Sequence, residues 1–96
     1  MKKHRYRVTI EYLADKEGQP VTAPPLQFEV GNHDEILFII EKIKSRNDFN
    51  DEDATAFGVG LKLFTEVMLN NRKMDLFSDF YPQMVDFMKT LKKGIP

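Results

Sequence analysis

Two short segments in which apolar and polar residues alternate are the strand signals of this sequence, and they limit the chain to a small sheet. The first segment, residues 4–13, is rich in β-branched and aromatic residues, which are favoured in strands. The second segment, residues 26–30, is shorter and alternates in the same way. Each segment therefore predicts a strand with one apolar face and one polar face. The apolar faces consist of Tyr6, Val8, Ile10 and Tyr12 in the first segment, and of Leu26, Phe28 and Val30 in the second.

The connection between these segments is dense in residues that break regular structure, and it ends in two consecutive prolines. We predict an antiparallel hairpin with a long mobile loop over roughly residues 14–24. Apolar side chains must face apolar side chains across such a pair, so the two residue numbers of each pair must have an even sum. Pairing Ile10 with Phe28 meets this condition. A tight turn at residues 15–18 does not, unless a bulge near residues 24–25 corrects it.

The first helix signal follows the second strand directly. Asn32 with Glu35 three residues later forms a capping-box pattern, and Asp34 beside Glu35 suits the positive end of a helix dipole. An apolar stripe at helical spacing comes next, and it is wider than the core-facing stripe of an ordinary surface helix. We expect a helix near residues 33–46 that is covered on more than one side. The stripe contains Ile36, Ile39, Ile40 and Ile43, with Leu37 and Phe38 beside it.

Two more helices are predicted near residues 51–71 and 79–93. Asn50 with Asp53 repeats the cap pattern at the start of the first of these helices. Pro82 lies in the first turn of the second, where its missing N–H costs little. Apolar residues at helical spacing predict that both helices pack on a core. The stripes are Ala54, Phe57, Leu61, Phe64 and Met68 in the first helix, and Phe77, Phe80, Met84, Phe87, Leu91 and Ile95 in and on either side of the second.

Two glycines stand inside the predicted helix at residues 51–71. Gly58 and Gly60 each cost about 1 kcal/mol relative to alanine in a helix interior. Such a cost is tolerable where another backbone must come close to the helix. We therefore expect a close approach at both glycines.

Together these signals predict the order β-β-α-α-α, an α+β fold of two layers in which one antiparallel hairpin packs on a layer of three helices. The chain has 96 residues, the length of one ordinary domain, and we expect residues 1–96 to form a single domain. A composition of 42% hydrophobic and 30% charged residues is typical of a globular protein rather than a disordered or fibrous one.

Three stretches of this sequence resemble those of a family of short bacterial single-domain proteins of about this length, catalogued only as a domain of unknown function. The stretches are Asn32-His33-Asp34-Glu35, Asp48-Phe49-Asn50 and Gly60-Leu61-Lys62-Leu63-Phe64. The resemblance covers nearly the whole chain. It implies a free-standing bacterial protein, and it transfers no activity, cofactor or site residue.

The charge and the missing cysteines weigh against several classes of function. Fourteen basic residues nearly balance fifteen acidic ones, so the net charge of −1 gives no sign of binding to nucleic acid or acidic membranes. The basic start of the chain, from Lys2 to Arg7, has the character of a nucleic-acid-binding strand. Pairing of Arg5 or Arg7 with Glu29 across the hairpin explains these charges at lower cost. Without cysteine there is no disulfide, thiolate nucleophile or sulfur-bound metal.

The apolar segments of the chain are short. The longest apolar run, from Ile36 to Ile40, is far shorter than the roughly 20 residues that a membrane-spanning helix needs. The basic residues at the N-terminus are not followed by the apolar region of a signal peptide. We therefore expect a soluble, cytoplasmic protein without a membrane segment.

An acidic cluster at residues 48–53 invites comparison with a calcium-binding loop. Such a loop would need glycine at its sixth position and glutamate at its twelfth, where this chain has Asp53 and Val59. Acidic residues that gather at the start of a helix explain the cluster without a metal. The pair Gly58 and Gly60 follows no predicted strand, which excludes a dinucleotide-binding loop. We expect neither a metal nor a cofactor.

The histidines offer one catalytic hypothesis. His33 could act as a general base beside Asp34 or Glu35. A solvated residue in a first helical turn is the simpler interpretation. Neither His33 nor His4 has a second histidine at the spacing that a zinc-binding helix needs.

A hairpin on its own is a marginal scaffold for the apolar helices of this chain. Two isolated strands are barely stable, and both of their edges present unpaired N–H and C=O groups. Neighbouring elements or a second copy must therefore cover these edges. Together with the wide apolar stripe of the first predicted helix, this leads to the hypothesis of a homodimer formed by sheet-edge pairing or by helix packing.

The leading functional hypothesis is a non-enzymatic interaction module that self-associates and docks an unidentified protein partner. Its candidate surface is the polar face of the hairpin together with the loop at residues 14–25. An alternative is a regulatory domain that binds a small apolar ligand between the sheet and the helices rich in Phe and Met. The polar face consists of Arg5, Arg7, Thr9, Glu11, Gln27 and Glu29.

Overall fold

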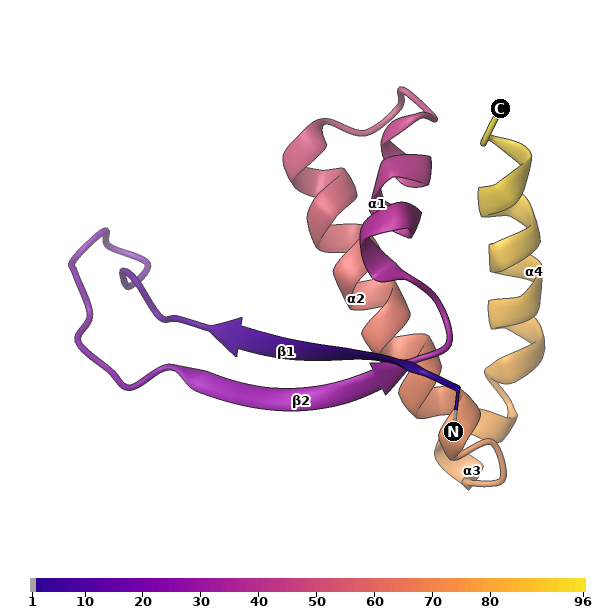
Figure 1. The fold of residues 1–96 in the computed structure, drawn as a ribbon, viewed down its shortest axis with the longest axis horizontal. Helices are drawn as coiled ribbons and strands as arrows, with labels where there is room; N and C mark the ends of the chain where they lie inside the picture. Colours follow the sequence, from indigo (N-terminus) through magenta and orange to yellow (C-terminus); the bar gives the residue numbers. More distant parts are fainter. Residues whose placement is uncertain (1) are drawn as a thin grey trace.

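The hairpin and the helices occupy different parts of the molecule (Figure 1). The computed structural model describes residues 2–96. In chain order its elements are β1 (His4–Ile10), β2 (Leu26–Asn32), α1 (Ile36–Lys44), α2 (Asp51–Asn70), α3 (Asp75–Ser78) and α4 (Tyr81–Lys93). Helices α1, α2 and α4 form one body, and the hairpin of β1 and β2 projects from it to one side. The predicted α+β fold, with an antiparallel hairpin followed by helices, is confirmed.

The two strands pair antiparallel along their whole length, with Val8 opposite Phe28 and Ile10 opposite Leu26. The predicted pairing of Ile10 with Phe28 is wrong by two residues. Its parity is right, because the apolar residues of both strands share one face. A shift of two residues keeps every side chain on its face, so alternation alone does not distinguish these registers.

The connection between the strands contains a hydrogen-bonded turn where a mobile loop was predicted. The carboxylate of Asp15 accepts hydrogen bonds from the backbone N–H groups of Glu17 and Gln19, at 3.0 and 2.9 Å. The carbonyl of Asp15 accepts another from Gly18 at 2.9 Å. Gly18 has a φ of 84°, a left-handed conformation that glycine adopts without strain. These bonds give the far end of the hairpin a defined shape.

An isolated bridge between Ala14 and Pro20 connects this turn to the strands. Between that bridge and the last pair of the strands, one side has the three residues 11–13 and the other has the five residues 21–25. The longer side contains the consecutive prolines. The structure therefore has the tight turn of the second alternative, and the two extra residues on the proline side shift the pairing by two while keeping every side chain on its face.

Helix α1 begins later than predicted because its expected cap residue has another role. Asn32 is the last residue of β2, and its side chain is buried. Glu35 caps the helix instead. Its carboxylate accepts hydrogen bonds from the N–H groups of Leu37 and Phe38, at 2.8 and 3.2 Å. A glutamate directly before the helix thus does what was expected of the asparagine three residues earlier.

The starts of the other helices agree better with the sequence. The side chain of Asn50 accepts a hydrogen bond from the N–H of Asp53 at 2.8 Å, which confirms the predicted cap of α2. Pro82 is the second residue of α4, inside the first turn as predicted. The single turn α3, which the sequence analysis did not separate from the last helix, connects α2 to α4.

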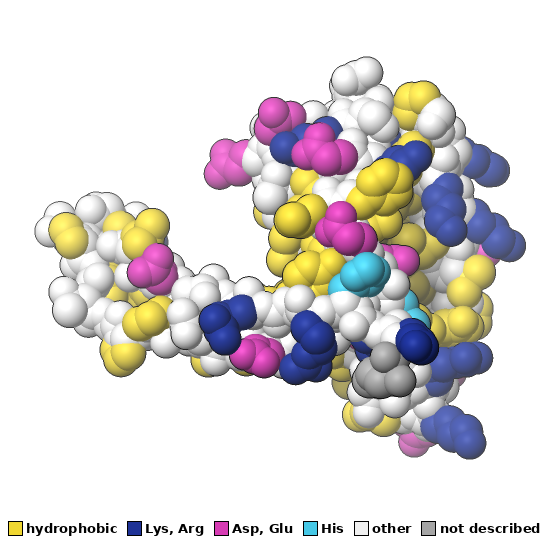
Figure 2. Space-filling model, in the orientation of Figure 1, with side chains coloured by type: hydrophobic (Ala, Val, Ile, Leu, Met, Phe, Trp, Pro, Cys, Tyr) yellow, Lys and Arg dark blue, Asp and Glu magenta, His cyan; other side chains and the backbone are white. Residues whose placement is uncertain are grey.

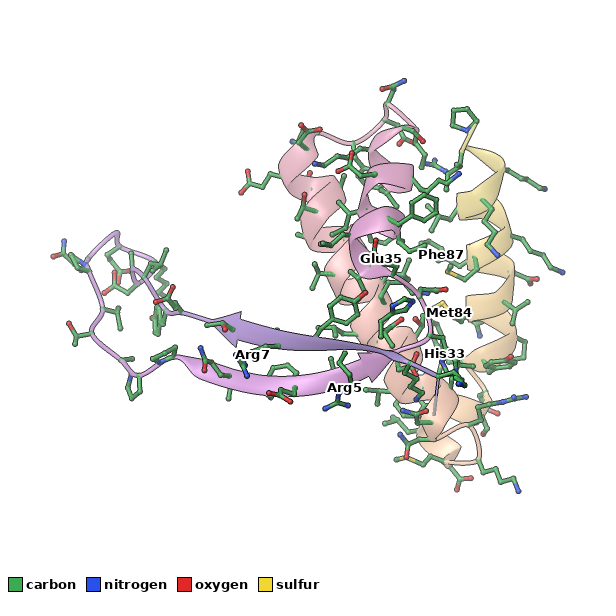
Figure 3. All side chains as sticks on the ribbon, in the orientation of Figure 1. Arg5, Arg7, His33, Glu35, Met84 and Phe87 are labelled. Carbon is green, nitrogen blue, oxygen red and sulfur yellow. The ribbon has the colours of Figure 1, made fainter. Side chains whose placement is uncertain are left out.

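One cluster of the core lies between α2 and α4, and further buried residues lie on α1 and at the start of α2. Met84 and Phe87 lie on the side of α4 that faces the other helices (Figure 3). The ring of Phe87 meets that of Phe57 edge-on, with 6.1 Å between their centroids. The buried residues of this cluster are Leu61, Met68, Met84 and Leu91, with Phe57, Phe77, Tyr81 and Met88 packed around them.

Helix α1 packs on α2 at one of the two glycines. A Cβ atom on Gly58 would lie 2.8 Å from Cγ1 of Ile40, so the close approach expected there is confirmed. The same atom on Gly60 would have no neighbour within 4 Å, so that expectation is wrong within this chain. The expected cover of α1 on a second side is also missing, because Leu37 and Phe38 are exposed.

Candidate interaction surface

The molecule exposes more surface than a compact chain of its size. Its accessible surface is 7427 Å², whereas about 5,700 Å² is typical of a folded protein of this mass. Its radius of gyration is 15.7 Å, against about 12.5 Å for a compact domain of this length. Figure 2 shows the projecting hairpin standing clear of the helical body. We call residues 4–8 and 28–32 the root of the hairpin, and residues 9–27 its tip.

Hydrogen bonds hold the root against the helices. The buried amide of Asn32 donates to the carbonyl of Lys62 at 2.9 Å, and its oxygen accepts from the N–H of Asp34 at 3.0 Å. The hydroxyl of Tyr6 donates to the carbonyl of Asp34 at 3.3 Å and accepts from the N–H of Ile36 at 2.8 Å. These side chains fix the root to α2 and to the start of α1.

A buried carboxylate of α2 holds the two residues that flank the root, Lys3 before β1 and His33 after β2. Glu66 is 7% exposed, and its Oε2 lies 2.7 Å from Nζ of Lys3 and 3.0 Å from Nδ1 of His33. Burial raises the pKa of Glu66, but hydrogen bonds from Lys3 and His33 outweigh it and lower the pKa to about 2. Glu66 is therefore ionised at neutral pH. No sequence pattern predicted this cluster; its one signal is a carboxylate inside the mostly apolar stretch at residues 63–68.

The residues of the catalytic hypothesis have separate partners. His33 contacts Glu66 from α2, Asp34 pairs with Lys62, and Glu35 caps α1. Figure 3 shows His33 in the link after β2 and Glu35 at the start of α1. The structure therefore does not bring His33 together with either carboxylate that the sequence paired with it.

The acidic cluster before and within the first turn of α2 is also accounted for by local contacts. Asp48 pairs with Arg46 at 2.6 Å, and the hydrogen bond from Arg46 lowers the pKa of Asp48. Asp51, Glu52 and Asp53 stand in the first turn of α2, at the positive end of its dipole. Within residues 2–96, His, Cys, Asp and Glu side chains nowhere gather in the groups of three that a metal ion needs.

The sequence predicts no membrane-spanning segment. In residues 2–96, none of the helices combines the length and the apolar character that crossing a bilayer requires.

The residues predicted to form the interaction surface share the polar face of the hairpin. Arg5 and Arg7 both project from β1 (Figure 3), and Arg7 lies opposite Glu29. Glu29 accepts a hydrogen bond from Arg7 at 2.9 Å, and its other oxygen lies 3.6 Å from Arg5. The pairing of these arginines with Glu29 across the hairpin is confirmed. The remaining predicted residues are exposed as well: Thr9, which lies opposite Gln27, and Glu11, which follows β1.

The apolar face of the hairpin changes character between root and tip. In the root, Tyr6, Val8, Phe28 and Val30 are half-buried. In the tip the same face is open to solvent, because the helices end short of it (Figure 1). The exposed fractions of these tip residues are 55% for Ile10, 57% for Tyr12 and 59% for Leu26.

A groove beside the root offers more apolar surface. Strand β2 and helix α2 form its walls, and its volume is about 660 Å³. Phe64 and Val67 of α2 are exposed in it, and Gly60 leaves space above the helix backbone. The apolar lining consists of Phe28, Val30, Leu63, Phe64 and Val67, and the polar rim includes Lys3, Arg5, Glu29 and Asn70.

Comparisons with known proteins agree on the fold and give no activity. A family model described as "Domain of Unknown Function with solved-structure structure (DUF3861)" matches residues 4–93. A crystal structure of a protein of unknown function from Pectobacterium atrosepticum is 37% identical, with a TM-score of 0.81 over 95% of this chain and 98% of that chain. No curated protein matches the chain. The resemblance to a family of unknown function is thereby confirmed.

Proposed function

The chain belongs to the DUF3861 family, and we propose that it is a self-associating interaction module whose projecting hairpin binds a second copy of the same chain. One observation carries this proposal. The apolar face of the hairpin continues past the helices, and its tip has no cover from residues 2–96. The sequence already led to the hypothesis of a homodimer, and in our proposal the second copy supplies that cover.

The uncovered surface is large enough for a stable dimer. The chain exposes about 1,700 Å² more than a compact protein of its mass. Each partner in a standard protein interface buries about 800 Å². Monomeric proteins rarely expose contiguous apolar patches above a few hundred Å². Association therefore removes from water a surface that a monomer of this shape leaves exposed.

The groove between β2 and α2 is the surface that we assign to the partner's tip. Its exposed apolar residues, Phe64 and Val67, match the exposed apolar residues of the tip. The open space at Gly60 lets a partner's side chain come close to α2. Each chain has both a tip and a groove, so two insertions related by a two-fold axis close the assembly.

The first experiment measures mass by light scattering during size-exclusion chromatography. We expect a dimer for the wild type at micromolar concentration. Leu26→Glu in the tip and Val67→Lys in the groove should each give a monomer, because each puts a charge into an apolar contact. Both side chains are more than half exposed in the single chain, so the variants should remain folded. A wild type that stays monomeric at high concentration would contradict the proposal.

Mixing the two monomeric variants tests whether the contact is reciprocal. A mixed dimer has one unchanged contact between a tip and a groove. In its other contact, the introduced glutamate in the tip of the first variant would meet the introduced lysine in the groove of the second. We expect the mixture to recover a dimer that neither variant forms alone. Sheet-edge pairing or packing of helices alone does not predict this recovery. A mixture that stays monomeric would rule out reciprocal insertion.

The polar face provides the matched control. Arg7 and Glu29 lie on the opposite side of the strands from Ile10 and Leu26, and Arg7 does not line the groove. Arg7→Glu should therefore leave the dimer mass unchanged. Arg5 and Glu29 line the groove, so in the proposed dimer the accessible part of this face is that of Arg7, Thr9 and Gln27, and we retain this part as the surface for docking a different protein.

A further inference from the structure

A second groove lies between α1 and α4, with α2 at its floor. Its volume is about 370 Å³, within the range of roughly 300–1,000 Å³ that is usual for small-molecule sites. Figure 2 shows apolar side chains on this part of the helical body and basic side chains along α4. The apolar lining consists of Phe38, Ile39 and Ile43, Leu61 from α2, and Met88, Leu91 and Ile95 from α4 and the residues after it.

Lysines stand at the rim of this groove. Lys62 pairs with Asp34, which is also at the rim. Lys42 and Lys92 have no carboxylate partner among residues 2–96. The ammonium group of Lys42 lies 5.2 Å from the centre of the Phe38 ring, above the apolar wall. Three lysines and one aspartate therefore give the rim a net charge of +2 over an apolar interior.

A partly buried hydrogen bond fixes one end of the groove. Arg46, just after α1, donates from Nη1 to the carbonyl of Leu91 in α4 at 2.6 Å. Its other nitrogens hold Asp48, at 2.6 Å for the shortest contact. This guanidinium thus connects the C-terminal ends of α1 and α4.

We infer that this groove binds an amphipathic carboxylate, with its hydrocarbon chain between Phe38 and Met88 and its carboxylate between Lys42 and Lys92. The apolar lining favours methylene groups over water. The two unpaired ammonium groups favour an anionic head through charge-assisted hydrogen bonds. A cationic amphiphile of the same length would meet the net positive rim. The site lies among the helices, away from the hairpin, and the inference is independent of self-association.

The test is a titration of the wild-type protein with hexanoate, octanoate and decanoate, each below its micelle-forming concentration. Chemical shifts of the methyl groups of Ile39, Met88 and Ile95 report binding in the groove, and the methyl groups of Leu26 report contact with the tip. We expect Kd to fall about fourfold for each added methylene that enters the groove. Decyltrimethylammonium should bind at least tenfold more weakly than decanoate.

Lysine variants locate the head group. Lys42→Gln and Lys92→Gln should each weaken decanoate binding about fivefold, and the double variant should remove the preference for decanoate over decyltrimethylammonium. Lys93→Gln is the matched control, because Lys93 is adjacent in sequence but does not line the groove. All of these lysines are exposed, so the substitutions should not disturb folding.

Three results would overturn the inference. These are shifts that map to the tip rather than to the groove, equal affinity for the two head groups in the wild type, and a Kd that does not depend on chain length. The monomeric variant Leu26→Glu should bind decanoate as the wild type does. Failure of the dimer and failure of this site are therefore separate outcomes.

Discussion

The root and the tip of the hairpin have the same alternation of apolar and polar residues, but only the root is covered by its own chain. The side chains of Asn32, Tyr6 and Glu66 connect the root and its flanking residues to the helices. The alternating pattern does not include Asn32 or Glu66, and it does not predict the hydrogen bonds of Tyr6. The apolar side chains of the tip continue the same face with no contact of this kind. Alternation thus specifies which face is to be buried and leaves open what buries it.

The difference also separates two sources of stability. The root gains free energy within one chain, from buried polar groups that are paired. The tip gains it only when another surface is present, because exposed apolar side chains contribute nothing until they leave water. Substitutions in the root should therefore alter the free energy of unfolding of a single chain. Substitutions in the tip should alter association.

The largest effect on a single chain is expected at Glu66. Its pKa of about 2 in the folded protein lies below the ordinary 4.5, so its ionised form stabilises the fold by about 3 kcal/mol above pH 4.5. This stabilisation is lost as the pH falls from 4.5 toward 2. We expect Glu66→Gln to be less stable than the wild type at neutral pH and the difference to vanish in acid, as measured by urea denaturation across pH. Glu41→Gln, on the exposed side of α1, is the control, and parallel pH profiles for wild type and Glu66→Gln would contradict the prediction.

A smaller loss is expected at Asn32. Alanine there leaves the carbonyl of Lys62 and the N–H of Asp34 without their partner, which costs about 2 kcal/mol. Urea denaturation at neutral pH measures this loss. Gln27→Ala, at an exposed position in the tip, should change the same quantity by less than about 0.5 kcal/mol. Equal losses for the two variants would remove the distinction between root and tip.

A gain is expected at Gly60. Alanine is favoured over glycine inside a helix, and its Cβ meets no atom here, so Gly60→Ala should stabilise the monomeric Leu26→Glu chain by about 0.5–1 kcal/mol. Thermal denaturation of that chain tests the gain. Gly58→Ala is the comparison, because its Cβ would meet Ile40 and the gain in helix propensity is offset by the displaced side chain. A loss of stability at Gly60 would mean that the groove beside the root is closed in solution.

The smallest effect on a single chain is expected at Leu26. Leu26→Ser removes an apolar side chain that is already in water, so the free energy of unfolding of the dilute monomer should change by less than about 0.5 kcal/mol. Val30→Ser, at a half-buried position of the same face in the root, should cost more. Denaturation at protein concentrations at which the chain is monomeric measures both losses. A large loss for Leu26→Ser would show that the tip is covered within one chain.

The sequence is sufficient for features that depend on local patterns. The strands, the parity of their pairing and the cap at Asn50 all follow from residues close together in the chain. The predicted register was wrong by two residues, because a hairpin with two extra residues on one side has the same alternation. The predicted cap of α1 was wrong because the side chain of Asn32 bonds to Lys62 of α2, thirty positions away. A short motif does not show that such a distant partner is present.

The candidate surface shows the same limit. The pairing of Arg7 with Glu29 follows from cross-strand geometry, and the polar face was placed correctly by alternation. The cluster joins Lys3 before β1, His33 after β2 and Glu66 in α2, and no spacing rule connects these three places in the sequence. The exposure of the tip depends on where the helices end in space. A pattern of residues along the chain does not show how far the helices extend along the hairpin.

The turn at Asp15 has a consequence for the speed and cost of association. In the proposed dimer the tip loses little freedom on contact, because one carboxylate and Gly18 already hold the end of the hairpin in a defined shape. A disordered loop of the same composition would have to pay for its ordering at that moment. In that proposal Asp15 has no interface contact of its own and acts by holding the tip in shape before a second copy binds.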